Sequence, residues 1–259
     1  MATVEARSQS RSEGLPSGPK LTVGVLGGMG PEATLDFFAK LLAATPAGRD
    51  QDRLRVLIDN NPQVPNRNEA VAGTGPSPAP LLANMARGLE AAGAQLLVMP
   101  CNAAHAFEAE IRAAVKVPFL SIIVETVAAT SRLGIQRVGV LAAAGTLDAG
   151  LYANAFERNG IEALEPRGEA RDEFMELLYL FKSGDAGKGV RIRMRALANS
   201  LVGAGAEAIV AGCTEVPLLL GEVDVPVPLV NSTDVLVDAT AEVATGRRLP
   251  SEPELDPHG

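Results

Sequence analysis

The chain of 259 residues contains two cysteines, Cys101 and Cys213, and each stands where an apolar run ends and a helix is expected to begin. In open parallel sheets, ligands bind at the carboxyl ends of the strands, so both thiols are candidates for a functional site. A thiol at the start of a helix also meets the positive end of the helix dipole, which favours the thiolate. Two thiols on opposite sides of one carbon could remove a proton from one face and return a proton to the other. The cysteines therefore predict acid–base chemistry that inverts a stereocentre without a cofactor.

An internal repeat places the two cysteines at equivalent positions. The stretch at 88–104, GLEAAGAQLLVMPCNAA, aligns without gaps with the stretch at 200–216, SLVGAGAEAIVAGCTEV. Upstream, the string VGVL begins at Val23 and again at Val138, at nearly the same separation as the two cysteines. Two copies of one strand–helix unit predict a chain folded as two similar halves, with one thiol from each half facing a shared cleft.

The elements that must position these residues follow from the hydrophobic pattern. Apolar runs rich in valine, leucine and isoleucine are typical of strands buried on both faces, and they occur at 21–26, 54–59, 95–99, 119–124, 137–141, 207–211 and 228–230. Amphipathic patterns predict helices at 31–44, 81–92, 171–182 and 190–202. Because strands alternate with helices, we expect an α/β fold of two pseudo-symmetric domains, each with a parallel sheet covered on both sides.

The same pattern divides the chain into four regions. We expect a disordered N-terminal segment at 1–20, an N-terminal α/β domain at 21–117 plus 230–247, a C-terminal α/β domain at 118–229, and a flexible tail at 248–259. The active site is expected in the cleft between the two domains. Residues 60–80 interrupt the alternation with several prolines and carry Arg67 in their middle. A structureless loop of this length is usually functional or disordered, and its place directly after a strand favours a function.

Composition and charge exclude several classes of function. A content of 47% apolar and 21% charged residues is typical of a globular protein with a core, and the net charge of −8 argues against a nucleic-acid partner. No apolar run reaches the roughly 18 residues that a membrane span needs. The N-terminus lacks the apolar region of a secretory signal, so we expect a cytoplasmic protein whose partner is a small molecule. Two cysteines and two histidines, without a close cysteine pair, predict neither a disulfide framework nor a metal site.

Three motifs resemble those of the aspartate/glutamate racemase family, the cofactor-independent amino-acid racemases. They are LGGMGPEAT at 26–34, MPCNAAH at 99–105 and GCTE at 212–215. The resemblance covers about residues 21–247 and implies a racemase without a cofactor, with two pseudo-symmetric α/β domains around the active site; it also suggests a homodimer. Cys101 and Cys213 match the two catalytic thiols of the family.

Matching the motifs residue by residue implies roles for their other side chains. Asn102 and Thr214, which follow the two cysteines, would hold the α-carboxylate and the amino group of the substrate. Met29 would line the pocket beside Gly28, which would support it. The resemblance therefore implies a pocket built from both halves of the chain.

An acidic substrate also needs a cation for its side-chain carboxylate. A family loop motif resembling Ile-Pro-Asp-Arg is matched by VPNR at 64–67, which implies that Arg67 binds this group. A family lysine before a glycine-containing turn is matched by Lys182 in YLFKSG. Arginine can form a bidentate pair with a carboxylate, which a chain of negative net charge needs in order to bind an anion. A solvated loop arginine and a lysine that caps a helix end stay open as alternatives.

Two positions depart from the family pattern. Ala103 and Ala143 stand where the family usually has threonine, although Thr146 is kept. Each lost hydroxyl removes a hydrogen bond worth roughly 1 kcal/mol, so the choice between aspartate, glutamate and another amino acid stays open. His105 and Glu215 follow the two cysteines closely, and each could tune a thiol or serve a structural role.

Other interpretations of the same residues stay open. Each cysteine could be a small buried hydrophobe, or the two could be a redox pair. The string GMGPEA at 28–33 satisfies a dinucleotide-binding pattern, but the next acidic strand end, at Asp59, lies too far along the chain. Two facing thiols also serve isomerases and decarboxylases that act beside a carboxylate. A non-catalytic homologue that binds a dicarboxylate would keep the pocket without the chemistry.

Overall fold

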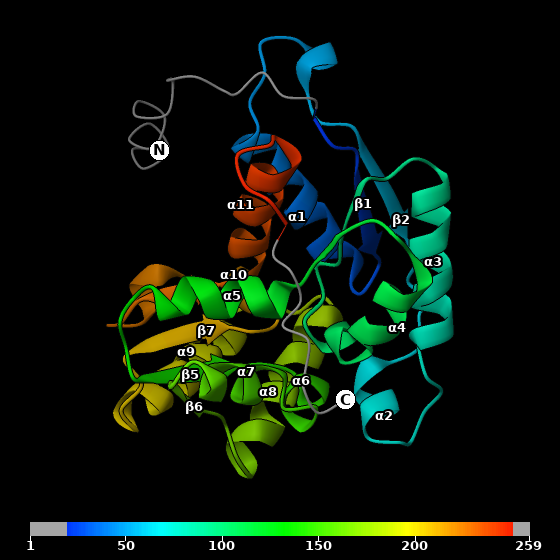
Figure 1. Ribbon diagram of the computed structural model, residues 1–259. Helices are drawn as coiled ribbons and strands as arrows, with labels where there is room; N and C mark the ends of the chain where they lie inside the picture. The colour runs from blue at the N-terminus through cyan, green and yellow to red at the C-terminus, as the bar shows by residue number, and fades with distance from the viewer. Residues whose placement is uncertain (1–19, 251–259) are drawn as a thin grey trace.

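Two four-stranded parallel sheets form the framework of the protein in the computed structural model, which describes residues 20–250 (Figure 1). The first sheet has the order β2-β1-β3-β4, with β1 at Val23–Gly27, β2 at Val56–Asn60, β3 at Leu96–Val98 and β4 at Phe119–Leu120. The second has the order β6-β5-β7-β8, with β5 at Arg137–Leu141, β6 at Glu162–Leu164, β7 at Ala208–Ala211 and β8 at Leu229–Asn231. The equivalent strand order confirms the prediction of two pseudo-symmetric parallel α/β halves.

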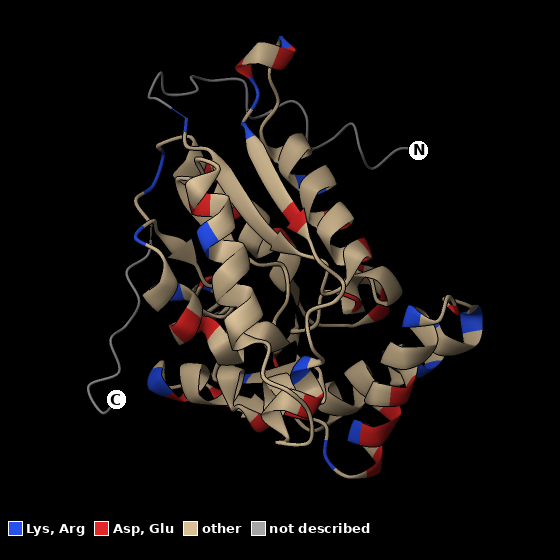
Figure 2. Cartoon of the chain, turned by 90° about the vertical axis from the view of Figure 1, so that its right-hand side faces the viewer, with Lys and Arg blue, Asp and Glu red and all other residues tan. Residues whose placement is uncertain are grey.

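Helices cover both faces of each sheet. Those expected from the sequence are α1 (Pro31–Ala44), α3 (Ala79–Ala91), α8 (Glu169–Lys182) and α9 (Lys188–Gly203). The others are α2 (Arg67–Val71), α4 (Glu108–Ala114), α5 (Ile122–Ser131), α6 (Ala144–Asp148), α7 (Leu151–Arg158), α10 (Val216–Leu219) and α11 (Ser232–Ala244), with 3-10 turns η2 (Asp50–Asp52), η3 (Ala103–Phe107) and η4 (Glu222–Asp224). Lys, Arg, Asp and Glu lie mainly on helices and loops, and the strands carry few of them (Figure 2). None of the helices between residues 20 and 250 is long and apolar enough to cross a membrane.

Two expectations about local structure were wrong, and one strand was not predicted. The run at 119–124 forms only two residues of strand before the chain enters α5 at Ile122, because an apolar run does not by itself distinguish a buried strand from a buried helix. The edge strand β6 was missed because its sequence, EAL, is short and largely unburied. The loop at 60–80 is not structureless, since it contains α2, whose N-cap is the side chain of Asn66.

The last described helix, α11, returns to the first half of the chain. It packs against α1 and α5, and the Leu21 amide donates to the carbonyl of Ala244 over 2.9 Å (Figure 1). One apolar core includes Val25 and Val98 from the first sheet, Val140 from the second and Leu236 from α11, all fully buried. Burying each of these side chains contributes about 1.5–3 kcal/mol, so a shared core holds the two halves together.

The expected domain limits stay a prediction. Strand β4 joins the first sheet just beyond residue 117, and β8 joins the second sheet up to Asn231. The expected N-terminal segment before Lys20 and the expected tail after Pro250 lie outside the described residues.

Candidate active site

A cavity of about 250 Å³ lies between the two halves, and both cysteines line it. Cys101 follows β3 and Cys213 follows β7, so each thiol lies beyond the carboxyl end of the equivalent strand in its own sheet. Both are buried, with exposed fractions of 5% and 8%. The other lining residues are Met29, Val64, Asn66, Arg67, Asn68, Asn102, Ala103, Ala143, Leu178, Tyr179, Lys182, Thr214 and Glu215. Two thiols from symmetry-equivalent positions therefore open into one small cavity.

The thiol of Cys213 lies beside a buried carboxylate. Its Sγ donates to Oε2 of Glu215 over 3.0 Å, and the hydroxyl of Thr214 donates to the same oxygen over 3.1 Å. Nζ of Lys182 lies 3.1 Å from the other carboxylate oxygen. Burial is the main cause that raises the pKa of Cys213 well above its ordinary value, and the negative charge of Glu215 adds to it. The pKa direction is therefore opposite to the one expected from a helix dipole, and the helix that follows, α10, has only four residues.

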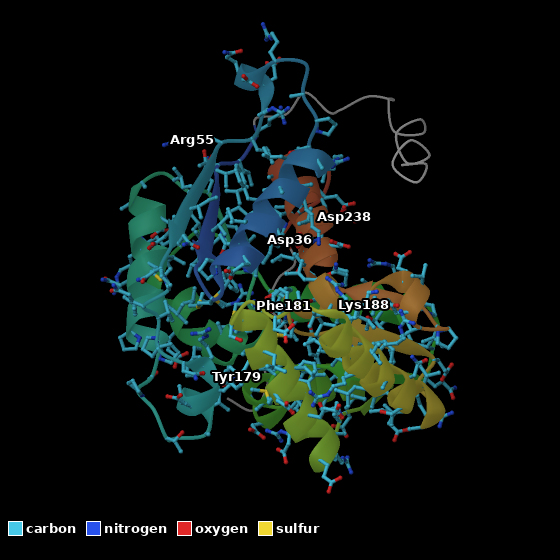
Figure 3. The ribbon with its side chains drawn as sticks, turned by 180° about the vertical axis from the view of Figure 1, so that it is seen from behind. Asp36, Arg55, Tyr179, Phe181, Lys188 and Asp238 are labelled. Carbon is cyan, nitrogen blue, oxygen red and sulfur yellow. The ribbon has the colours of Figure 1, made fainter. Side chains whose placement is uncertain are left out.

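Lys182 stays charged despite its partial burial. Burial acts to lower its pKa, but the carboxylate of Glu215, as a nearby negative charge and a hydrogen-bond partner, outweighs that effect and raises the pKa. The lysine therefore forms an ion pair inside the cavity wall, and helix capping alone does not describe its position. Its neighbours on the same face of α8, Leu178 and Tyr179, also line the cavity. Figure 3 labels Tyr179 among the side chains.

Replacing Glu215 with glutamine should lower the pKa of Cys213, because the variant removes the negative charge beside the thiol and leaves Lys182 without its partner. A charged neighbour at this distance shifts a pKa by about one to three units, and removal of a like charge shifts the pKa of a thiol downward. The measurement is the pH dependence of Cys213 alkylation by iodoacetamide in a Cys101→Ser background. The exposed Glu222→Gln variant is the control. A midpoint that stays in place or moves upward would contradict the assignment.

His105 supports the turn of Cys101 without lining the cavity. Its Nδ1 donates to the carbonyl oxygen of Cys101 over 2.8 Å, and its Nε2 accepts from the amide of Ile122 over 3.2 Å. With one nitrogen donating and the other accepting, the ring is neutral. Burial lowers its pKa below the ordinary value, although the carboxylate of Glu108 opposes this. These two bonds give His105 structural contacts, and a role in tuning the thiol stays a prediction.

The neutral His105 should make the protein less stable in mild acid. Because the folded-state pKa is lowered, the unfolded chain takes up the proton more readily, so stability is full above about pH 6.5 and falls as the pH drops below it. The loss amounts to about 1 kcal/mol over the first pH unit. Urea unfolding at about pH 8 and about pH 5.5 measures it. The His105→Gln variant should show a smaller fall between the two conditions, and an equal fall would exclude His105 as the cause.

The glycine-rich turn after β1 brings Met29 to the cavity. Gly28 has φ +90°, and a Cβ there would lie 2.4 Å from the backbone carbon of Asn61, so no other residue fits. Its amide donates to Oγ1 of Thr34 over 2.9 Å. Gly28 itself does not line the cavity. It therefore supports Met29 through the shape of the backbone.

The segment at 60–80 crosses to the second half of the molecule. Arg67 lines the cavity, its Nη1 donates to the carbonyls of Val64 and Pro65, and its buried Nε has no partner within the described chain. The side chain of Asn68 accepts from the Gly145 amide over 2.8 Å, at the start of α6. These contacts place a guanidinium in the cavity wall with donor capacity left over.

The remaining expected residues divide between the cavity wall and the interior. Ala103 and Ala143 present methyl groups to the cavity where the family pattern has hydroxyls. Thr146 is fully buried behind the wall, and its hydroxyl has no partner among the described residues. Asn102 lines the cavity, but its amide is engaged: it accepts from the hydroxyl of Tyr152 and donates to Ser232. No group of three potential metal ligands occurs between residues 20 and 250.

Sequence reasoning missed several residues of the wall. Val64, Asn66 and Asn68 come from the segment around Arg67, and Leu178 and Tyr179 come from α8. The helical spacing of 178 and 179 relative to Lys182 was a usable signal, because residues three and four apart share a helix face. The conformation of the loop around Arg67 could not be predicted from such a spacing.

Comparison with known proteins gives a consistent set of relatives. The family model for Asp/Glu/hydantoin racemases matches residues 26–240. The broad specificity amino-acid racemase RacX of Bacillus subtilis strain 168 is 24% identical over 222 residues, which cover 84% of this chain and 96% of RacX. Picrophilus torridus aspartate racemase is similar in structure, with a TM-score of 0.77 and 30% identity over 87% of this chain and 94% of that chain. An aspartate racemase homologue from Pyrococcus horikoshii OT3 has a TM-score of 0.70 and 25% identity, over 86% of this chain and 99% of that chain.

Proposed function

Because the chain belongs to the Asp/Glu/hydantoin racemase family, we propose that it is a racemase that interconverts the L- and D-isomers of an acidic amino acid without a cofactor. The observation that carries this proposal is the pair of thiols, one from each half, that open into a single cavity. Aspartate and glutamate are the proposed substrates, and each would be held between Cys101 and Cys213. The proposal adds a reaction and a substrate class to the family membership.

The reaction needs a base on one face of the substrate and an acid on the other. In the free enzyme Cys213 keeps its proton, because it is buried and donates to Glu215. In the proposed mechanism Cys101 is the base, and it takes the Cα proton from the isomer whose Cα–H faces it. The carbon–hydrogen pair of electrons remains on the substrate as a carbanion delocalised into the α-carboxylate. Cys213 delivers its proton to the opposite face and becomes the thiolate, so one proton leaves and one enters.

The reverse reaction uses the same groups with the proton positions exchanged. After one turnover, Cys101 carries a proton and Cys213 is a thiolate beside the negative charge of Glu215. That neighbour makes the thiolate of Cys213 a stronger base, while the ammonium of Lys182 limits the repulsion. The Glu215–Lys182 pair therefore serves the second thiol in this mechanism, and Arg67 is the proposed partner of the substrate's side-chain carboxylate.

Proton NMR in D₂O tests the proposal directly. L-aspartate and L-glutamate are incubated separately with the protein, and the expected result is loss of the Cα–H signal together with appearance of the D-isomer. Formation of a product without the carboxyl group would indicate a decarboxylase. Exchange without inversion would contradict the two-base mechanism. If the Cα–H signal of no amino acid in a wide panel decays, the result would reject racemase activity and favour a non-catalytic binding homologue. The Cys101→Ala/Cys213→Ala double variant controls for contaminating enzyme.

We further propose that the protein acts as a homodimer, as the family resemblance suggests, and light scattering on the purified chain measures this. A cytoplasmic location stays a prediction of the sequence.

A further inference from the structure

Tyr152 is fully buried, does not line the cavity, and has no part in the proposed proton transfer. It lies on α7, in the second half of the chain, and it is the largest of the fully buried side chains in the described residues. Its ring stacks on Phe156 with the centroids 5.9 Å apart. A buried phenol requires partners for its hydroxyl, and those partners lead to both cysteines.

The hydroxyl of Tyr152 reaches the turn that carries the first thiol. It donates to Oδ1 of Asn102 over 2.6 Å, and Asn102 is the residue directly after Cys101. Burial raises the pKa of Tyr152, so the phenol stays a neutral donor. This hydrogen bond runs from the second half of the chain to the first, and it fixes the amide of Asn102 in one orientation.

The ring of the same residue reaches the turn that carries the second thiol. Gly212 directly precedes Cys213, and a Cβ built on it would lie 2.8 Å from Cε2 of Tyr152. That distance is too short for any other residue, so the tyrosine ring and the backbone of the second turn are in direct contact. Tyr152 therefore touches the neighbour of each cysteine, one through its hydroxyl and one through its ring.

Ser232 provides a second path of hydrogen bonds between the two thiol turns. Nδ2 of Asn102 donates to Oγ of Ser232 over 3.2 Å, and that hydroxyl donates to the carbonyl of Ala211 over 2.7 Å. Ala211 precedes Gly212, so this path also joins the first thiol turn to the second. Asn102, Tyr152 and Ser232 are all buried, and buried polar networks of this kind hold one geometry.

We propose that Tyr152 is a positioning residue that sets the separation of the Cys101 and Cys213 thiols across the cavity. Its kinetic effect rests on the proposed racemase function, whereas its geometric effect does not. Two-base transfer needs both sulfurs at attack distance from one carbon, and a misplacement of about 1 Å is enough to cost about a hundredfold in rate. The residue acts on the reaction only through the two turns that it joins.

The kinetic test uses Tyr152→Phe, which keeps the ring against Gly212 and removes the bond to Asn102. The expected result is a fall in kcat of at least tenfold and up to about a hundredfold, with KM within about threefold of the wild type, because the lining side chains remain. Ser232→Ala breaks the second path and should lower kcat less. In the double variant the losses should not multiply, since both changes act on one network. A kcat within about twofold of the wild type in Tyr152→Phe would overturn the proposal.

The geometric test does not depend on activity. Cys101 and Cys213 are the only cysteines of the chain, so a short bis-alkylating reagent such as dibromobimane reports on this pair alone. Mass spectrometry gives the ratio of bridged to singly labelled protein, and the expected result is a change of at least about threefold in Tyr152→Phe. An unchanged ratio overturns the proposal even if kcat falls. If the wild type proves inactive, the proposed function fails while this ratio still decides the role of Tyr152.

Thr240→Val separates positioning from general destabilisation. Thr240 is fully buried on α11 and donates to the carbonyl of Leu236 over 2.6 Å, away from both thiol turns. This variant should lower the melting temperature as Tyr152→Phe does, but leave kcat and the bridging ratio unchanged. Equal losses in both variants would reduce the role of Tyr152 to stability and overturn the proposal. If Tyr152→Phe does not fold, kcat and the bridging ratio are measured in Ser232→Ala, and an unchanged value of either one overturns the proposal.

Discussion

Changing either Cys101 or Cys213 to alanine is expected to abolish racemisation of aspartate and glutamate, with kcat/KM lower by up to about 10⁴-fold. Each direction of the reaction passes through both thiols, because one takes the proton and the other returns it. A single substitution therefore blocks L-to-D and D-to-L conversion alike. The measurement is the rate at which circular dichroism of a pure isomer decays, for both isomers and both variants.

The two variants should nevertheless differ in their exchange of the Cα proton with D₂O. Each retains one thiol, which can still remove and return a proton on the face that it occupies. Cys213→Ala should therefore exchange the Cα–H of one isomer without inversion, and Cys101→Ala should exchange that of the other. A Cys101→Ala enzyme with full turnover would contradict the mechanism. Unchanged melting temperatures are needed for the comparison, because both side chains are buried.

Replacement of Arg67 by alanine is expected to lower kcat/KM for aspartate by about a hundredfold, mostly through KM. A hydrogen bond to a charged group contributes about 1.5–3 kcal/mol, and the guanidinium has a buried Nε without a partner among residues 20–250. Arg67→Lys keeps the charge but loses the planar fork, so its activity should lie between those of the wild type and the alanine variant. Steady-state kinetics on both isomers measure the effect.

Two controls make the role of Arg67 specific. Arg49→Ala removes one cation from an exposed position outside the cavity, and it should leave kcat/KM unchanged. Asparagine has the length of aspartate but no side-chain carboxylate, so any residual turnover of asparagine should be insensitive to Arg67→Ala. Equal losses for aspartate and asparagine would show that Arg67 acts on the loop and not on the carboxylate.

The sequence was sufficient to predict the α/β class, the two halves and the pair of thiols. These predictions came from the repetition of one strand–helix unit with a cysteine at the same place in each copy. The role of Arg67 was implied by the resemblance of VPNR at 64–67 to a family loop motif, and the place of its segment directly after a strand favoured a function. The local pattern failed at the run beginning with Phe119, because the chain leaves the strand after two residues and enters α5, which is itself apolar and largely buried.

The electrostatics and the internal support of the site were not predictable in the same way. The pKa of Cys213 depends on burial and on the close approach of Glu215, which follow from the packed structure and not from the order of residues. Tyr152 lies 50 positions from Asn102, and Ser232 lies 130 positions from it, so no window of sequence contains the network. Contacts between residues so far apart in the sequence form only when both halves are folded together.

The return of α11 to the first half has a consequence for biosynthesis. Ribosomes release the chain from its N-terminus, so the first sheet emerges long before Leu236 and its neighbours on α11. These α11 residues belong to the same apolar core as the first sheet. Until then, that part of the first sheet's core is incomplete and the nascent half exposes apolar surface, the state in which chains aggregate or recruit chaperones. The hydrogen bond between Leu21 and Ala244 likewise cannot form until the last turn of α11 has been synthesised. The protein therefore completes its first half after its second, and the two thiols can meet only after Cys213 has emerged from the ribosome.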